Sequence, residues 1–267
     1  MLKIVTLNIL IDLYRWNLRG QLIVTALRDL NPDVIAFQEV DLPTNTAQWI
    51  ADHLDGYSVF LAPNSGLKEG EGLAILTRLP IEKHEILDLG PQNRKAQLIY
   101  FQQNGETYVL ANTHLFWQNG HAPERKAQAQ LILNHFADLP VNTHQILCGD
   151  FNSEPDSPTI SLVKQSMHSA YESINGTEPA FTCPTPLDRS LKSRWWQLKN
   201  AINQPKNLVL NNKATIDYIF LSPSLQAVQS QLVFDQPYPT HTHLFASDHF
   251  GIMAEVKPAL TTDKVGV

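Results

Sequence analysis

The chain has 267 residues, of which 43% are hydrophobic and 17% are charged. This composition is typical of a folded globular domain and excludes an intrinsically disordered chain. The sequence has no run of about 18 apolar residues, so it predicts no membrane-spanning helix. The net charge of −6 lacks the basic excess that usually accompanies a long duplex-binding groove.

Two cysteines, Cys148 and Cys183, are too few for a disulfide framework. Cys148 lies in an apolar run, so we expect it to be a small core residue. The first eight residues already read as a strand that ends on a candidate site residue. They leave no room for a signal peptide, so the expected location is the cytoplasm.

Short apolar runs alternate with helical patterns along the whole chain, without a repeat or a linker. Strands are predicted at residues 4–7, 34–37, 73–76, 108–111, 145–148, 216–221 and 250–256. Several of these runs are apolar at almost every position, which indicates burial on both faces.

The first predicted helix carries Ile23, Leu27 and Leu30 at helical spacing and ends before Pro32. The second is predicted from Pro123, which suits a first-turn position, to about residue 139. A weaker third helix is expected at residues 46–54. Strands buried on both faces and covered by helices predict a layered α/β or α+β domain.

Residues 181–205 differ from the rest because prolines, basic residues and two tryptophans gather there. We interpret this stretch as an insertion with a short helix near residues 190–201. It would interrupt a single catalytic domain of residues 1–258, which is followed by a tail of residues 259–267.

Six apolar strands end or begin with a side chain that can bind a metal ion or move a proton. These side chains are Asn8, Glu39, His114, Asp150 with Asn152, Asp217, and Asp248 with His249. A single Asp, Asn or His at a strand end is commonly a turn former or a structural residue. Several carboxylates at one edge of a sheet, however, would lose hydration and repel one another. A bound divalent cation compensates both effects, so the pattern predicts a metal site.

The residue types indicate which chemistry such a metal site would support. Oxygen ligands such as Glu39, Asp248 and the Asn8 amide favour Mg²⁺ or Mn²⁺ over a metal that prefers thiolates. A carboxylate beside the cation can activate water, and an imidazolium can stabilise charge on phosphoryl oxygens. The set therefore indicates hydrolysis of a phosphodiester.

A second metal hypothesis concerns zinc. His241 and His243 form a His-x-His pair close to His249, and such a pair can bind zinc. The sequence has no second ligand pair at a diagnostic spacing. A polar loop near the active site is therefore the favoured interpretation.

These blocks, in this order, closely resemble the endonuclease/exonuclease/phosphatase superfamily. The matching stretches are Thr-Leu-Asn8, Phe-Gln-Glu39-Val, Asn-Thr-His114-Leu, Gly-Asp150-Phe-Asn152, Ile-Asp217-Tyr-Ile-Phe and Ser-Asp248-His249-Phe. The stretch from Gly72 to Arg78-Leu-Pro resembles the central strand of that family. The resemblance spans the chain from Asn8 to about Val256.

Finer features are similar to the branch that contains poly(A) deadenylases, nocturnin and 2′-phosphodiesterases. They include Ala111-Asn-Thr-His-Leu-Phe-Trp117 and the stretch from Cys148-Gly-Asp-Phe-Asn to Ser157. Members of that branch cleave RNA ends or small nucleotides with magnesium. This chain lacks the leucine-rich repeat region, and residues 181–205 have no counterpart that we recognise.

The resemblance implies a fold of the α+β class. Its architecture is a four-layer α-β-β-α sandwich, in which two packed mixed β-sheets are flanked by helices. It further implies a site for Mg²⁺ (or Mn²⁺), in which Glu39 is the principal metal ligand and Asn8 and Asp248 lie close by.

The resemblance also implies catalytic roles. Asp150 would position or deprotonate the attacking water, with Asn152 beside it. His249 would contact the scissile phosphate and would be oriented by Asp217. His114 occupies the position where other branches place a tyrosine or histidine against the phosphate. Whether Asp150 or a metal-bound hydroxide is the base stays open.

The favoured substrate is single-stranded RNA or DNA. Trp117, Trp195 and Trp196 could stack on bases, although each could instead fill the core. Lys192, Arg194 and Lys199 could meet phosphates, and Arg78 is a further candidate for substrate binding. A small nucleotide, an inositol phosphate or a lipid headgroup is the alternative, which the acidic charge favours slightly. A third hypothesis is a binding module that has lost activity. No obligate protein partner is indicated.

Overall fold

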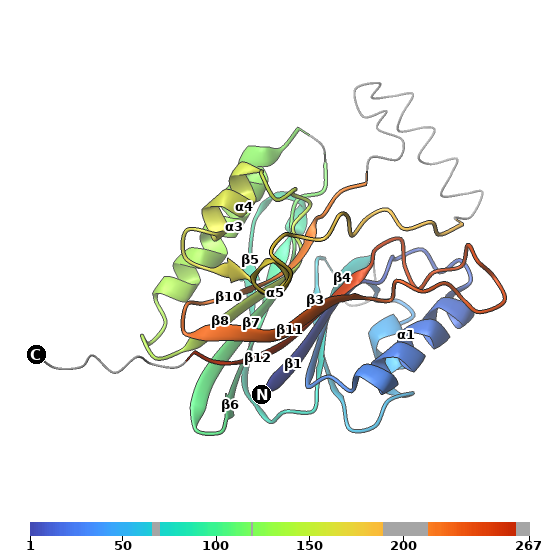
Figure 1. Ribbon diagram of the computed structural model, residues 1–267, viewed down its shortest axis with the longest axis horizontal. Helices are drawn as coiled ribbons and strands as arrows, with labels where there is room; N and C mark the ends of the chain where they lie inside the picture. Colours follow the sequence, from blue (N-terminus) through green and yellow to red (C-terminus); the bar gives the residue numbers. More distant parts are fainter. Residues whose placement is uncertain (66–69, 119, 189–212, 260–267) are drawn as a thin grey trace, which may run out of the picture.

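A computed structural model describes residues 1–65, 70–118, 120–188 and 213–259. These residues form two stacked six-stranded sheets with helices on the two outer faces (Figure 1). The strands of the first sheet are β1 (Leu2–Asn8), β2 (Val34–Asp41), β3 (Ser58–Pro63), β4 (Glu71–Thr77), β11 (Leu225–Val233) and β12 (Gly251–Pro258). Their order across the sheet is β11-β12-β1-β2-β4-β3.

The second sheet follows the same plan. Its strands are β5 (Ile81–Asp88), β6 (Lys95–Gln103), β7 (Glu106–His114), β8 (His144–Asp150), β9 (His168–Ser169) and β10 (Asp217–Leu221). Their order across the sheet is β5-β6-β7-β8-β10-β9. Each sheet holds one parallel pair, β1 with β2 and β7 with β8, among antiparallel neighbours. Both sheets are therefore mixed, as predicted.

Helices cover the outer face of each sheet. The helices α1 (Trp16–Leu30) and α2 (Thr46–Ala51) share a core with the first sheet, and α3 (Ala122–Ala137) and α4 (Pro158–Val163) share one with the second. A short helix, α5 (Ala170–Asn175), and a 3₁₀ turn, η1 (Pro91–Asn93), lie in the connections. The predicted four-layer α-β-β-α sandwich is confirmed.

The alternation of β1 shows how the core divides into layers. Ile4 packs between the two sheets, whereas Val5 and Leu7 pack against helix α1. Successive side chains of a strand point to opposite faces, so a strand covered on both faces is apolar at every position. Cys148 lies in the layer between the sheets and is fully buried, as expected.

Three predicted helices fall within the described residues and are confirmed, although the third ends at Ala51 and is shorter than predicted. Helix α1 ends at Leu30, where Asn31 adopts a left-handed conformation and its N–H bonds to the carbonyl of Leu27. Helix α3 begins at Ala122 with Pro123 in its first turn, where proline loses no hydrogen bond. The short helix expected near residues 190–201 lies outside the described residues, as does nearly all of the expected tail.

One buried arginine organises the loops next to the carboxyl end of β1. Arg19 of α1 is fully buried, and its guanidinium donates to the carbonyls of Ile9 (2.9 Å), Ala246 (3.1 Å) and Tyr14 (3.1 Å). Burial lowers its pKa to about 10, against the opposing influence of Asp248 and other nearby carboxylates. The group stays charged at neutral pH, and it ties the loop after β1 to the segment before β12.

We expect Arg19→Met to lower the free energy of unfolding by about 3 kcal/mol or more, because it leaves several buried carbonyls without a donor. Denaturant unfolding would measure the loss. Arg28→Met, on the exposed side of the same helix, is the matched control and should cost less than about 1 kcal/mol. Equal losses in the two variants would contradict this account of Arg19.

Candidate active site

The sheet topology brings the residues predicted to be catalytic or to bind metal to one edge of the sandwich. Strands β1, β2, β7 and β8 all end there, because each pair is parallel. Strands β4, β10 and β12 begin at the same edge, because each runs antiparallel to one of these strands. The residues at this edge are Asn8, Glu39, Glu71, His114, Asp150, Asp217, Asp248 and His249.

Glu39 reaches the space between the sheets through a break in the regular register of β2. Ile35 and Phe37, on the same face by alternation, pack against the helices. The pairing with β4 shifts between Phe37 and Val40, and Glu39 has φ 55, which is uncommon for a residue other than glycine. The bulge turns its carboxylate toward Asn8 (3.1 Å); bulges commonly re-aim side chains at active sites.

A glycine allows the close approach of β7 and β8 beside Asp150. Gly149 has φ +130, and a Cβ there would lie 2.0 Å from the carbonyl oxygen of Thr113. No other residue fits this position without moving a strand. The consequence is that His114 and Asp150, paired across the two strands, come close, with 3.5 Å between Nε2 and Oδ2.

A single side-chain amide joins the two sheets at this edge. Nδ2 of Asn8 donates to Glu39 Oε1 and to Asp150 Oδ2, each at 3.1 Å. Its Oδ1 accepts from the N–H of Leu10 at 3.0 Å, which orients the amide. Glu39 and Asp150, from different sheets, are thereby held on either side of Asn8.

His249 is oriented by a buried carboxylate. Its Nδ1 lies 2.9 Å from Oδ2 of Asp217, and its Nε2 lies 3.9 Å from Oδ2 of Asp150. Burial alone would lower the pKa of His249, but its interactions with Cys183 and Asp217 outweigh burial and hold the pKa well above the ordinary value. An imidazolium at this position can donate from Nε2.

His114 has the opposite protonation preference. Burial, followed by the charges of Arg94 and His249, holds its pKa well below the ordinary value. The Arg94 guanidinium lies 3.3 Å from Nδ1 of His114, so Nδ1 accepts and Nε2 carries the proton that faces Asp150. Arg94 also forms an ion pair with Glu71. The two histidines flanking Asp150 are therefore one neutral and one charged.

The carboxylates at this edge are electrostatically strained. Burial and, second, the neighbouring Asp217 raise the pKa of Asp150 to about 7. The pKa of Glu39 is raised by burial and then by Glu71 and Asp248. Buried carboxylates that lie close together supply the oxygen ligands that a hard divalent cation prefers, and the cation would compensate their negative charge. Ligand atoms of Glu39, Glu71 and His114 lie within 4.8 Å of one another.

Asn152 also lies at this edge, as expected. Its backbone N–H donates to Oδ1 of Asp150 at 2.8 Å, and its Nδ2 donates to the carbonyl of Leu115 at 3.1 Å. It adopts φ 48, a conformation that asparagine tolerates better than most residues. Asn152 thus fixes one oxygen of the Asp150 carboxylate.

The residues predicted to bind substrate are placed differently. Arg78 follows the far end of β4 and hydrogen-bonds to Asn31 and Pro32, so it lies at the opposite edge from Glu39. Trp117 follows the carboxyl end of β7 and is 45% exposed. Arg194, Trp195 and Trp196 lie outside the described residues.

The His-x-His pair is exposed in the turn before β12. Ligand groups of three or more His, Cys, Asp or Glu residues do occur in the described part of the chain, but none of them includes His241 or His243. The structure therefore gives no support to a zinc site at this pair, and the interpretation as a polar loop is retained.

Three residues at this edge escaped the sequence analysis: Glu71, Arg94 and Cys183. Glu71 had a usable signal, since it directly precedes the apolar run of β4 in the same way as the other site residues. Arg94 follows a turn and precedes the polar start of β6, so its sequence context carries no signal of burial. Cys183 lies inside the stretch interpreted as an insertion.

Comparison with known proteins identifies the family. Residues 5–249 match the Endonuclease/Exonuclease/phosphatase family, and the chain therefore belongs to it. The resemblance stated from the strand-end residues is confirmed, as is the prediction of a hydrolytic enzyme at the level of the family. Its enzymes are generally dependent on divalent metals, and this structure contains a candidate site of acidic and histidine residues.

Two curated relatives fall in or near the predicted branch. The probable RNA exonuclease NGL3 of Saccharomyces cerevisiae is 26% identical over 168 residues, which are 54% of this chain and 33% of that protein. The 2′,5′-phosphodiesterase 12 of Bos taurus is 26% identical over 289 residues, covering 90% of this chain and 46% of that protein. This chain thus spans about a third to a half of the length of these two relatives.

Two solved structures share the fold. The human Nocturnin catalytic domain with a bound sulfate anion has a TM-score of 0.74 and 21% identity, covering 97% of this chain and 94% of that chain. The TDP2 of D. rerio in complex with a single-strand DNA product has a TM-score of 0.76 and 18% identity, covering 96% and 98%. At these identities the likeness concerns the fold.

Helices long and apolar enough to cross a membrane were sought in the described residues, and none was found.

Proposed function

We propose that this chain is a divalent-metal-dependent phosphodiesterase, and specifically a nuclease that hydrolyses single-stranded RNA or DNA. One observation carries the proposal: Asn8 holds Glu39 of one sheet and Asp150 of the other, each 3.1 Å from the same amide nitrogen. The candidate metal ligand and the candidate base therefore face a common space at the edge of the sandwich.

The residues present fit an oxygen-liganded cation. Glu39 and Asp248 would hold it, with Glu71 within reach and the Asn8 amide beside them. This donor set suits Mg²⁺ or Mn²⁺. When bound, such a cation neutralises phosphate charge and polarises the phosphorus–oxygen bonds. The pKa of Glu39 is raised first by burial and then by Glu71 and Asp248, which means that the charged carboxylate is destabilised. A bound cation would remove this destabilisation.

Asp150, His249 and His114 would have different roles in the hydrolysis. Asp150, whose pKa burial raises to about 7, is suited to take the proton of a water molecule that attacks phosphorus. His249, held by Asp217 at 2.9 Å, would donate from Nε2 to a phosphoryl oxygen as negative charge builds there. His114 would donate its Nε2 proton toward the same group. The ester oxygen leaves on the side opposite the attacking water.

Two observations favour a single-stranded substrate. The net charge of −6 does not suit a long duplex. The Trp117 ring is 45% exposed next to the strand that carries His114, where a base could stack on it. The relatives named above as an RNA exonuclease and a 2′,5′-phosphodiesterase support the same substrate class. The latter also supports the alternative of a small nucleotide substrate.

The test is a panel of phosphodiesters in Mg²⁺: oligo(A) RNA, single- and double-stranded DNA, 2′,5′-linked adenylate, inositol phosphates and an activated diester. We expect single-stranded oligonucleotides to be cleaved fastest and excess EDTA to abolish cleavage. Full activity in EDTA would overturn the metal requirement. Cleavage of a small diester alone would transfer the assignment to the alternative, and no cleavage of any member would favour an inactive module.

Trp117 offers a separate prediction about binding. We expect Trp117→Ala to weaken binding of single-stranded oligonucleotide by about 1–3 kcal/mol, because one base loses its stacking partner. Trp117→Phe is the control, since a smaller ring keeps part of the stack. Fluorescence anisotropy with a labelled oligonucleotide would measure both. Unchanged binding together with a lower melting temperature would show that the ring serves packing instead.

We also propose the cytoplasm as the location. Cys148 and Cys183 are both free thiols, as is usual for proteins of a reducing compartment. Fractionation of the native cells would test this proposal.

A further inference from the structure

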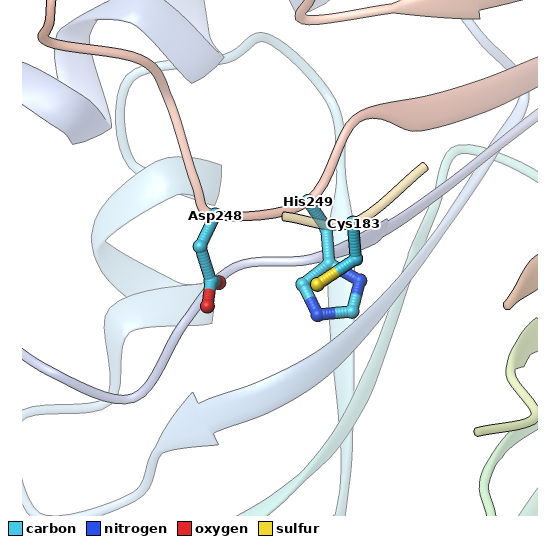
Figure 2. Close-up of side chains that lie close together, drawn as sticks. All are labelled: Cys183, Asp248 and His249. Carbon is cyan, nitrogen blue, oxygen red and sulfur yellow. The ribbon is translucent and has the colours of Figure 1, made fainter. Parts of the chain in front are cut away.

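Cys183 lies against the catalytic edge, although the proposed hydrolysis does not use it. Its Sγ, a carboxylate oxygen of Asp248 and a ring nitrogen of His249 all lie within 4.8 Å of one another. Figure 2 shows the three side chains directed to the same side of their backbones. The Cys183 backbone is anchored, since it exchanges hydrogen bonds of 3.1 and 2.7 Å with Ala214.

Backbone pairing fixes this arrangement. The segment that carries Cys183 runs beside the segment that carries Asp248 and His249 (Figure 2). The N–H of Thr185 donates to the carbonyl of Asp248 at 2.8 Å, and the N–H of Phe250 donates to the carbonyl of Thr182 at 2.7 Å. These two backbone hydrogen bonds flank Cys183 and fix the position of its thiol beside Asp248 and His249.

The three ligand types differ from those around Glu39. A thiolate, an imidazole and a carboxylate form a set that binds Zn²⁺, with three protein ligands and an open fourth position. Nδ1 of His249 already bonds to Asp217 at 2.9 Å, which leaves Nε2 to bind a metal. A carboxylate that orients a metal-binding histidine through its other nitrogen is a common support for zinc. Cys183 is partly exposed, so an ion can reach it from solvent.

We propose that Cys183, Asp248 and His249 form a second metal site, which shares Asp248 with the proposed Mg²⁺ site. It is selective for thiophilic divalent cations such as Zn²⁺, and its occupation inhibits the enzyme. Binding releases two protons to solvent, one from the Cys183 thiol and one from Nε2 of the His249 imidazolium, so that the Nε2 lone pair can bind the metal. A histidine held in this way cannot donate to a phosphoryl oxygen. The proposal goes beyond the hydrolytic function, because metal binding at this site does not depend on any substrate.

The binding experiment uses Co²⁺ as a spectroscopic substitute for Zn²⁺, added to the full chain in excess Mg²⁺. A thiolate ligand gives a near-ultraviolet charge-transfer absorption that an oxygen-only site lacks. We expect the absorption in the parent protein and its loss in Cys183→Ser. Cys148→Ala, which removes the only other cysteine, is the matched control and should keep it. No absorption in the parent, or its persistence in Cys183→Ser, would overturn the proposal.

A second measurement remains valid if a serine variant folds poorly. In the parent chain, Zn²⁺ should slow alkylation of Cys183 by iodoacetamide under native conditions, as followed by mass spectrometry of its peptide. Alkylation at the same rate with and without Zn²⁺ would contradict the site. Neither this measurement nor the absorption requires hydrolytic activity, so both can succeed even if the proposed function fails.

The functional consequence is tested by inhibition. Because Cys183 also supports the raised pKa of His249, inhibition by Zn²⁺ is measured relative to each protein's own rate in Mg²⁺ alone. The Zn²⁺ concentration for half-inhibition should rise by about 10–100-fold in the variant, the usual cost of weakening a metal site. Equal sensitivity to Zn²⁺ in the two proteins would show that inhibition arises elsewhere.

Discussion

Asp150→Asn is expected to lower the turnover rate by about 10²–10⁴-fold, because the amide keeps the shape of the side chain but accepts no proton. The carboxylate is buried at the centre of the site, with Asn8, Asn152 and His249 around it. Single-turnover kinetics at saturating Mg²⁺ would isolate the chemical step. Asp156→Asn, an exposed position in the following loop, makes the same chemical change and should remain within threefold of the parent.

The same substitution should change how the stability of the fold depends on pH. Burial, with Asp217, raises the pKa of Asp150 from 3.8 to about 7. Between these values the folded state holds a proton that the unfolded state has lost, so the stability contributed by this group falls as pH rises from 3.8 to about 7. Asp150→Asn has no carboxyl group at this position and therefore lacks this decrease in stability with pH. Thermal unfolding in EDTA should therefore show the variant gaining on the parent as pH rises, and a constant deficit would contradict the raised pKa.

Glu39→Gln should act on metal affinity rather than on the chemical step. Asn8 Nδ2 and the N–H of Ile11 each donate to one carboxylate oxygen of Glu39 at 3.1 Å. The substitution keeps one of these two acceptor oxygens and removes the negative charge. We expect the Mg²⁺ concentration for half-maximal activity to rise by about 100-fold or more, since even a supporting residue of a metal site commonly costs 10–100-fold. Activity at very high Mg²⁺ should recover in part.

The control for Glu39 is Glu82→Gln, which changes an exposed carboxylate on β5 and should leave the Mg²⁺ dependence unaltered. Isothermal titration with Mn²⁺ would measure binding directly in both variants. A Glu39→Gln enzyme with the parent's Mg²⁺ dependence and a lower maximal rate would remove Glu39 from the metal site and place it in the chemistry.

The sequence predicted the interior of the sandwich better than its borders. The strands that it missed include β3, β5, β9 and β11, and these four are the edge strands of the two sheets. An edge strand pairs on one side only, and its sequence is more polar, as in the Ile-Glu-Lys-His-Glu start of β5. The interior strand β6 was also missed, because it begins and ends with polar residues.

The site was predicted through residues at the ends of apolar strands, and the remainder lacked that signal. Asn8 and Asp150 lie at the ends of largely apolar runs, and His114 follows one after Asn112 and Thr113, so their positions could be predicted along the chain. Arg94 contributes through contacts with residues far away in sequence, which no local pattern encodes. The bulge at Glu39 could not be predicted from the sequence either, since strict alternation would have turned this side chain toward the helices.

The amide bridge at Asn8 has a consequence for how the chain acquires its activity. Asn8 and Asp150 are 142 positions apart along the chain, and Gln38 bonds across to Asn112 at 2.7 Å beneath them. The candidate site is complete only when the segment with Asn8 and Gln38 has docked on the segment with Asn112 and Asp150. Contacts between residues so far apart in sequence form slowly during folding. A nascent chain that has made only its amino-terminal part therefore lacks the proposed catalytic centre.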